Sequence, residues 1–264
     1  MDYTLKCTRC TKEYGPQSTA FRCKLCKSVL EVSYDYSTLE LNAGFRNEVP
    51  SSQKYVQFLP LSTPLRTLEE GSTELKAVDT EELLGDGSVK LHLKIETENP
   101  TRTFKDRGTA VEITKAMELG FSDVCCASTG NMGLSIAKYS RHFGLSSTIF
   151  ISKDANTEKL RKIEEQGAKL EKVDGDFNDS LVLAEEFARY NQNFLCGDYH
   201  YRKEGQKSLI FEMLDQLGYQ VPDYLFVQVG NATLLSAIYK GLKEYKKAGL
   251  IKKVPRLIAV QSES

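Results

Sequence analysis

Three patterns that mark particular classes of protein are missing from this 264-residue sequence. No apolar run approaches the roughly 18 residues that a membrane-spanning helix requires, and the N-terminus lacks the basic-then-apolar pattern of a secretory signal. The net charge of −1 argues against a protein that grips the nucleic-acid backbone. We therefore expect a cytoplasmic protein that binds neither membrane nor nucleic acid, and its 41% hydrophobic and 27% charged residues are ordinary for one.

Histidine is also scarce, with three in the chain. His92 falls in a predicted strand and His142 falls late in a predicted helix, so we expect structural or exposed roles for both. His200 precedes Arg202 by two residues and is the histidine that we expect nearest to a functional site.

Cysteine, by contrast, is plentiful and unevenly placed. Cys7 and Cys10 form one Cys-x-x-Cys pair, and Cys23 and Cys26 form a second pair after a 12-residue insert. Without a secretory signal, such pairs favour metal ligands over disulfides, and four thiolates can close a tetrahedral zinc site. We expect residues 1–36 to form a zinc-ribbon-like module whose metal is structural. The alternative is a ribbon that keeps its cysteines as buried thiols.

The rest of the chain alternates between strand and helix patterns, and this order predicts parallel sheets covered by helices. Strands are predicted at 65–68, 89–95, 123–127, 147–152, 169–173, 193–196, 224–229 and 256–261. Helices are predicted at 80–84, 156–166, 179–190 and 204–217, with three others that end at Leu119, Gly144 and Ala248. Cys125 and Cys126 lie within an apolar strand and are expected to be core thiols.

The predicted fold is therefore α/β, with open and mostly parallel sheets covered by helices. We expect a larger domain from residues 37–120 and 197–264, and a smaller domain from residues 121–196. Because the chain stops directly after a strand that would need covering, we expect the C-terminal part of a longer protein to be absent.

The most informative stretch is Asn99-Pro-Thr-Arg-Thr-Phe-Lys-Asp-Arg-Gly108, between a strand pattern and a helix pattern. It places Lys105 where a turn becomes the first turn of a helix, an end that disfavours positive charge. A desolvated lysine there could be a nucleophile of the kind that forms a Schiff base with a carbonyl compound. The simpler alternative is a solvated lysine at a helix start.

Two further loops follow predicted strands and precede predicted helices, where ligands of open α/β sheets bind. Gly230-Asn-Ala-Thr-Leu234 offers successive backbone N–H groups that could cradle a phosphate, although such a loop is often only a tight turn. Ser128-Thr-Gly-Asn-Met132 suits a carboxylate or a ring hydroxyl, and its alternative is a capped turn. A nucleophilic lysine, a phosphate cradle and a polar loop are together the parts of a pyridoxal phosphate site.

At these residues the chain resembles the threonine synthases, pyridoxal phosphate enzymes of fold type II. The family's usual lysine motif is Asn-Pro-Thr-Gly-Ser-Phe-Lys-Asp-Arg-Gly, which Asn99–Gly108 matches with Arg102 and Thr103 in place of Gly and Ser. The resemblance implies that Lys105 carries the cofactor and that Asn131 contacts the cofactor's ring oxygen. Ser128 and Thr129 would hold the carboxylate of an amino-acid substrate.

The resemblance extends to the phosphate-binding segments. Val229-Gly-Asn-Ala232 is similar to the start of the family's phosphate loop, from which Thr233 and Leu234 depart. Tyr201–Lys207 resembles the family's Arg-x-Glu-Gly-Gln-Lys segment, which implies that Arg202 contacts the substrate's phosphate.

Other departures bear on the substrate. Met132 replaces a usual threonine, and Cys196-Gly197 replaces an Asn-Ser pair, so hydrogen-bond donors to a substrate phosphate would be lost. Arg102 could compensate as a bidentate phosphate ligand. The first hypothesis is an enzyme that converts O-phospho-L-homoserine and water to L-threonine and phosphate. The alternatives are another β-eliminating or β-replacing lyase acting on a serine- or threonine-like amino acid, and a non-catalytic fragment. Association into homo-oligomers is left open.

Overall fold

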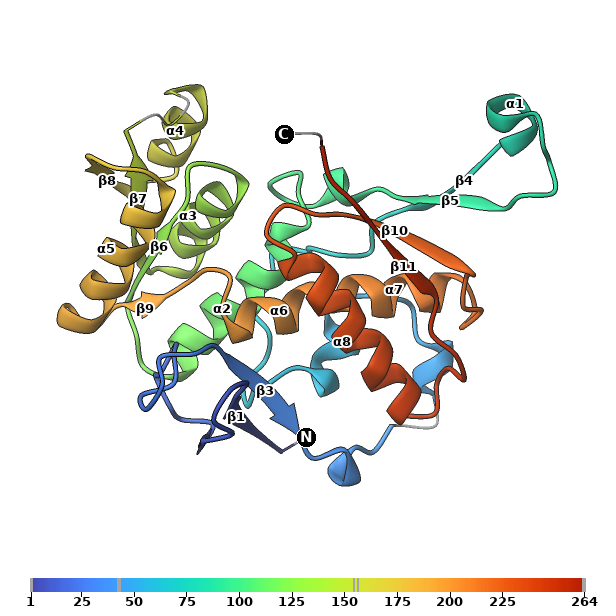
Figure 1. Cartoon of the computed structure of the whole chain (residues 1–264), viewed down its shortest axis with the longest axis horizontal. Coiled ribbons are helices and arrows are strands. Elements are labelled where there is room, and N and C mark those ends of the chain that lie inside the picture. The colour runs from blue at the N-terminus through green and yellow to red at the C-terminus, as the bar shows by residue number, and fades with distance from the viewer. Residues whose placement is uncertain (1, 42–43, 154, 156, 263–264) are drawn as a thin grey trace.

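A computed structural model describes residues 2–41, 44–153, 155 and 157–262 (Figure 1). One part of it is a four-stranded parallel sheet with the strand order β8-β7-β6-β9. Its strands are β6 (Asp123–Ala127), β7 (Ser146–Ser152), β8 (Lys169–Val173) and β9 (Phe194–Leu195), and its helices are α3 (Asn131–Phe143), α4 (Thr157–Glu164) and α5 (Phe177–Tyr190). The alternation of β6 directs Cys125 towards the α5 side and Cys126 towards the α3 side, and both thiols are fully buried, as predicted.

The second part is helical and lies beside this sheet (Figure 1). It contains a two-stranded parallel sheet, made by β10 and β11. Its elements are α2 (Lys105–Glu118), α6 (His200–Gln206), α7 (Ser208–Gln216), β10 (Tyr224–Gln228), α8 (Thr233–Lys247) and β11 (Arg256–Val260). Aromatic residues, among them Phe58, Phe211 and Tyr245, fill the core between α7 and α8, and the Phe211 and Tyr245 rings stack at 4.3 Å.

Helices α2 and α6 cross closely at two glycines. A Cβ atom on Gly205 would lie 2.0 Å from the carbonyl oxygen of Arg107, and one on Gly108 would lie 2.8 Å from Cγ of Arg202. Neither distance is possible for a real side chain, so the crossing requires glycine at both positions. Because α2 also packs against α3, this contact joins the four-stranded parallel sheet to the helical part.

The N-terminal residues form a three-stranded antiparallel sheet with the order β2-β1-β3. Tyr34 of this sheet donates a hydrogen bond to the buried Glu204 of α6 at 2.6 Å, which fixes the ribbon to the helices. A second antiparallel pair, β4-β5, carries α1 away from the rest of the molecule (Figure 1, upper right). The strands are β1 (Tyr3–Cys7), β2 (Glu13–Tyr14), β3 (Leu30–Tyr34), β4 (Leu75–Val78) and β5 (Leu91–Lys94), with α1 at Thr80–Leu84 and 3₁₀ turns at Tyr36–Thr38, Phe45–Asn47, Gln53–Phe58 and Glu96–Glu98.

The predicted α/β class with parallel, helix-covered sheets is confirmed, and most predicted elements match to within a few residues. The predicted strand at 65–68 is wrong: this segment has no regular structure, and Leu65 is buried against the core instead. The predicted helix over 204–217 begins earlier, at His200, and is divided at Lys207, where the Ser208 hydroxyl donates to the Gly205 carbonyl at 2.8 Å. The predicted start of a helix at residue 156 lies outside the described residues. Across the described part of the chain, none of the helices has the length and apolarity needed to cross a membrane.

Candidate active site and cysteine cluster

Lys105 opens α2, as predicted, and its amine faces the carboxylate of Asp198. Lys105 Nζ lies 4.0 Å from Asp198 Oδ1, and 19% of the lysine side chain is exposed. Burial lowers the pKa of the Lys105 amine; Asp198 acts in the opposite direction, and the Arg202 guanidinium lowers the pKa further. The amine therefore loses its proton at a lower pH than a solvated lysine does, which favours a nucleophile over a surface charge.

The two residues after Lys105 hold the turn in place. The buried Asp106 accepts hydrogen bonds from the Thr101 amide at 2.6 Å and from the Ser135 hydroxyl of α3 at 2.5 Å. Arg107, also buried, pairs with Glu96 at 2.7 Å and with Glu212 at 3.0 Å. Since both neighbours are bound to other elements, the direction of the Lys105 side chain follows from contacts that Lys105 does not itself make.

Arg202 is completely buried and directs its guanidinium at the protein. It donates to the carbonyl of Lys105 at 3.3 Å, to the carbonyl of Gly197 at 3.2 Å and to the Thr109 hydroxyl at 3.3 Å, and it forms an ion pair with Glu112. The Glu112 carboxylate also accepts from the Gly197 amide at 2.8 Å. In this structure Arg202 thus positions the backbone of Lys105, although the sequence led us to expect a ligand of the substrate's phosphate.

Asp198 joins the lysine to the predicted phosphate loop. Besides facing Lys105, it accepts a hydrogen bond from the side-chain amide of Asn231. The loop itself turns through Ala232, whose φ is 62°, and α8 begins at Thr233. A cavity of about 250 Å³ lies against it, lined in part by Asp198, Lys203 and Asn231. Exposed backbone at Gly230 and Asn231, a helix N-terminus and adjacent space fit the phosphate of a cofactor.

The loop from Ser128 to Met132 has a different character from the phosphate loop. The buried Ser128 hydroxyl accepts from the amides of Gly130 at 3.3 Å and Gly133 at 3.0 Å, so Ser128 caps α3. Thr129 is half-buried, and Asn131 is exposed at the first position of α3. Across the described residues, no hydrogen bond links these three side chains to Lys105.

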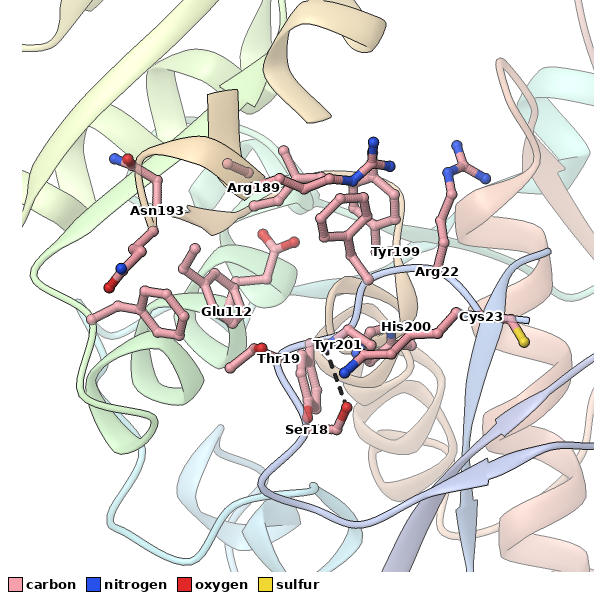
Figure 2. Close-up of a pocket in the computed structure, with 18 of the residues that line it drawn as sticks. Ser18, Thr19, Arg22, Cys23, Glu112, Arg189, Asn193, Tyr199, His200 and Tyr201 are labelled. Atoms are coloured by element: carbon pink, nitrogen blue, oxygen red, sulfur yellow. Dashed lines mark hydrogen bonds between the residues drawn. The ribbon is translucent and has the colours of Figure 1, made fainter. Parts of the chain in front are cut away.

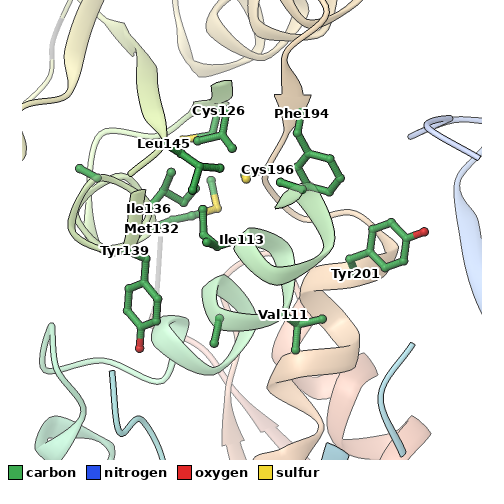
Figure 3. Close-up of a cluster of buried hydrophobic side chains, with 14 of the residues drawn as sticks. Val111, Ile113, Cys126, Met132, Ile136, Tyr139, Leu145, Phe194, Cys196 and Tyr201 are labelled. Atoms are coloured by element: carbon green, nitrogen blue, oxygen red, sulfur yellow. The ribbon is translucent and has the colours of Figure 1, made fainter. Parts of the chain in front are cut away.

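Three residues at which the sequence departs from its relatives also have definite places. Met132 and Cys196 are buried in the hydrophobic cluster between α2, α3 and β6 (Figure 3). Arg102 is exposed on the turn before Lys105, and its φ of 63° is a conformation that favours glycine. Met132 and Cys196 are therefore core residues here, whereas Arg102 remains accessible to a ligand.

The remaining predicted residues, Thr233, Leu234 and His200, are buried. Leu234 and Thr233 are buried at the start of α8, and Thr233 lines the cavity beside the phosphate loop. His200 is 3% exposed, and burial lowers its pKa to about 3, so the imidazole is neutral. It lines the cavity beside the phosphate loop together with Asp198, and it also lines a second cavity.

Two residues of this site were missed in the sequence. Asp198 is an acidic residue two positions after a predicted strand, which is the place where ligand-binding side chains of α/β sheets occur. Glu112 is a charged residue within an otherwise buried stretch of α2, and it lies seven residues after Lys105 on the same helix face. Both features can be seen in the sequence, but neither predicts which residue Asp198 or Glu112 contacts.

Four cysteines of the N-terminal module gather at one point. The Sγ atoms of Cys7 and Cys26 are 3.5 Å apart, those of Cys10 and Cys23 are 3.6 Å apart, and all four lie within 4.8 Å of one another. All four are free thiols. Amides of Arg9 and Cys10 point at the Cys7 sulfur, at 3.4 and 3.5 Å, and would stabilise a thiolate there.

The influence of Asp198 on Lys105 leads to a measurable prediction. Replacing Asp198 with asparagine removes the charge that raises the pKa of Lys105, so more of the amine is neutral at pH 8. We expect acylation of Lys105, followed by peptide mass spectrometry, to proceed roughly three- to tenfold faster in Asp198→Asn. The exposed Asp223, which pairs with Lys253, provides the matched Asp223→Asn control. An unchanged or slower rate at Lys105 would contradict this electrostatic role.

Comparisons with known proteins identify the family of the chain. Residues 63–264 match the profile of the family described as pyridoxal-phosphate dependent enzymes. The chain is 37% identical to a threonine synthase of Methanosarcina acetivorans and 35% identical to one of Methanocaldococcus jannaschii, over 99% and 98% of its own length. It spans 65% of the length of each.

Among solved structures, the apo form of diaminopropionate ammonia lyase from Escherichia coli has the same fold, with a TM-score of 0.63 at 18% identity. That match covers 74% of this chain and 61% of the lyase. The fold, the lysine at the start of α2 and the family match lead to one conclusion. The chain belongs to the family of pyridoxal-phosphate dependent enzymes, and it has threonine synthases among its relatives.

Proposed function

We propose that this protein catalyses the threonine synthase reaction, which converts O-phospho-L-homoserine and water to L-threonine and phosphate. The observation that carries the proposal is the set Lys105, Asp198 and Asn231, in a chain that is 35–37% identical to threonine synthases over nearly its whole length. The set joins a lysine of lowered pKa to a loop that suits a phosphate. The substrate itself is taken from the relatives.

Several residues would hold the cofactor. Lys105 would carry it covalently, the backbone from Gly230 to Leu234 would bind its phosphate, and Asn131 would contact the ring oxygen. When bound, pyridoxal phosphate supplies an electron sink for the bonds at Cα of the amino acid. Asp198 keeps Lys105 and the phosphate loop at a fixed separation, since it contacts both.

Lys105 is also the group that we assign to proton transfer. Its lowered pKa lets the neutral amine accept a proton from Cα of the substrate and later return it to carbon. The hydrogen bond from Arg202 to the Lys105 carbonyl limits how far the lysine backbone can move during these transfers. Asp198 is close enough to stabilise the ammonium form between them.

The substrate's two anionic groups need separate partners. Ser128 and Thr129 are proposed to bind the carboxylate. Because the Ser128 hydroxyl already caps α3, the backbone of this loop and the Thr129 hydroxyl would make most of the contacts. The exposed Arg102 is proposed for the substrate's phosphate, with Arg202 in the positioning role described above. A homo-oligomer and a cytoplasmic location remain predictions.

A second candidate is a lyase that acts on serine or threonine without a substrate phosphate. Met132 and Cys196 favour it, because apolar side chains that are buried in the core offer no donors to a phosphate (Figure 3). The two candidates differ in the leaving group, which is phosphate in one and hydroxide in the other.

A product assay separates the candidates. The purified protein with pyridoxal phosphate should release inorganic phosphate from O-phospho-L-homoserine and form L-threonine in equal amounts. Lys105→Ala should lower this rate by roughly 10²- to 10⁴-fold or more, because it removes the base. Lys153→Ala, at a lysine whose side chain is 60% exposed, should leave the rate unchanged. Ammonia release from serine or threonine with no phosphate release from O-phospho-L-homoserine would support the second candidate instead.

We further propose that the cysteine cluster holds a structural zinc ion. Tetrahedral Zn–S bonds of about 2.3 Å place the sulfurs roughly 3.8 Å apart, and the spacings of 3.5 and 3.6 Å come near that value. All four ligand positions would be filled by protein, which leaves no open site for chemistry.

Metal analysis tests this assignment. The protein, purified without chelator, should contain about one zinc per chain, and Cys10→Ser should lower that content and the thermal stability. Cys125→Ala changes a buried core thiol outside the cluster and should retain the metal. Substoichiometric zinc in the unaltered protein would refute the site.

A further inference from the structure

A second cavity lies between the N-terminal ribbon and the four-stranded parallel sheet (Figure 2). Its volume is about 560 Å³, within the range of small-molecule sites. One wall is the ribbon segment from Ser18 to Cys23, and the opposite wall is the end of α5 with β9. Aromatic rings cover much of both walls: Phe21, Phe121, Phe194, Tyr199 and Tyr201.

The outer end of the cavity is positively charged. Arg22 pairs with Glu185 at 2.7 Å, Arg189 pairs with the same carboxylate at 3.3 Å, and the Tyr199 hydroxyl donates to it at 2.9 Å. Two guanidinium groups thus share one carboxylate, and Lys24 and Lys27 also line the cavity, so positive charge is in excess and guanidinium N–H donors are left for a ligand. The guanidinium groups also lie over aromatic faces, Arg22 at 5.8 Å from the Tyr199 ring and Arg189 at 5.1 Å from the Phe21 ring.

Polar side chains also line the cavity. His200 is 97% buried there, and neither ring nitrogen has a hydrogen-bond partner among the described residues. A buried imidazole without partners costs free energy unless a ligand or water completes it. Glu112 also lines the cavity, but both of its oxygens are already bonded, to Gly197 and to Arg202.

We propose that this cavity binds a small aromatic carboxylate. The carboxylate would lie between Arg22 and Arg189, whose planar donors suit a bidentate anion and whose positive charge is added to by Lys24 and Lys27. The flat body would lie between the aromatic walls, and a polar atom at its far end would bond His200. Lys105, Asn131 and Asn231 do not line this cavity, which shares Phe21, Tyr199 and His200 with the smaller cavity beside the phosphate loop.

The sequence offers a convenient probe for this site. It contains no tryptophan, so indole fluorescence reports the probe alone. Indole-3-acetate should bind saturably, with a rise in fluorescence anisotropy, and the neutral indole-3-acetamide of nearly the same shape should bind roughly tenfold more weakly or worse. Equal affinity of the two probes, or no saturable binding of the acetate, would overturn the proposal.

Variants locate the binding. Arg189→Met keeps the side-chain length and should weaken indole-3-acetate binding roughly tenfold. Arg161→Met, at an arginine of α4 that is 72% exposed, is the matched control and should bind as the unaltered protein does. His200→Phe keeps a buried ring and should weaken binding a few-fold. If Arg189→Met and Arg161→Met bind equally, the assigned cavity is wrong. A thermal melt of each variant separates this outcome from misfolding.

Discussion

The close crossing of α2 and α6 is the constraint on which the rest of the site depends. Gly108 and Gly205 let the two backbones meet at distances that exclude any side chain. Only this approach brings the Arg202 guanidinium within hydrogen-bond distance of the Lys105 carbonyl. A crossing wider by the thickness of one methyl group would separate these groups and release the start of α2.

Buried ion pairs position the other side chains around Lys105. Arg202 with Glu112, and Arg107 with Glu96 and Glu212, are ion pairs taken out of water, where an unpaired member would cost several kcal/mol. These ion pairs therefore fix the positions of the helices more than they add to the free energy of unfolding. Lys105, in contrast, is partly desolvated, and its amine lies 4.0 Å from the carboxylate of Asp198, farther than the arginines lie from theirs. That difference separates the reactive lysine from the structural arginines beside it.

Much of the fold was predictable because strand and helix periods are local properties of sequence. The strands at 123–127 and 169–173 were predicted at their observed bounds, and Gly120 and Gly144 end helices in the left-handed conformation. The strand predicted at Leu65–Leu68 failed because its apolar residues are buried by tertiary contacts without a pairing partner. The break at Lys207 was also missed, since a single residue between two helices leaves no gap in the helical period.

The site was predictable in its loops but not in its side-chain directions. Lys105 and the segment 230–234 occupy the strand–helix junctions that the sequence indicated. The contacts of Arg202 with Lys105 and Glu112 could not be predicted, because the motif gives its position on a helix but not the neighbour that α6 meets. The burial of Met132 and Cys196 in the hydrophobic cluster likewise depends on neighbouring elements that the motif does not give. Asp198, which links the two loops, could only be recognised once both partners were placed.

The glycine-mediated crossing of α2 and α6 holds the start of α2. The most direct test is the free energy of unfolding of Gly205→Ala, compared with Gly15→Ala, where a Cβ atom would meet nothing within 4 Å. We expect Gly205→Ala to lose about 3 kcal/mol or more, because its methyl group must push apart two buried backbones, while Gly15→Ala stays within about 0.5 kcal/mol of the unaltered protein. Equal stability of the two variants would contradict the account.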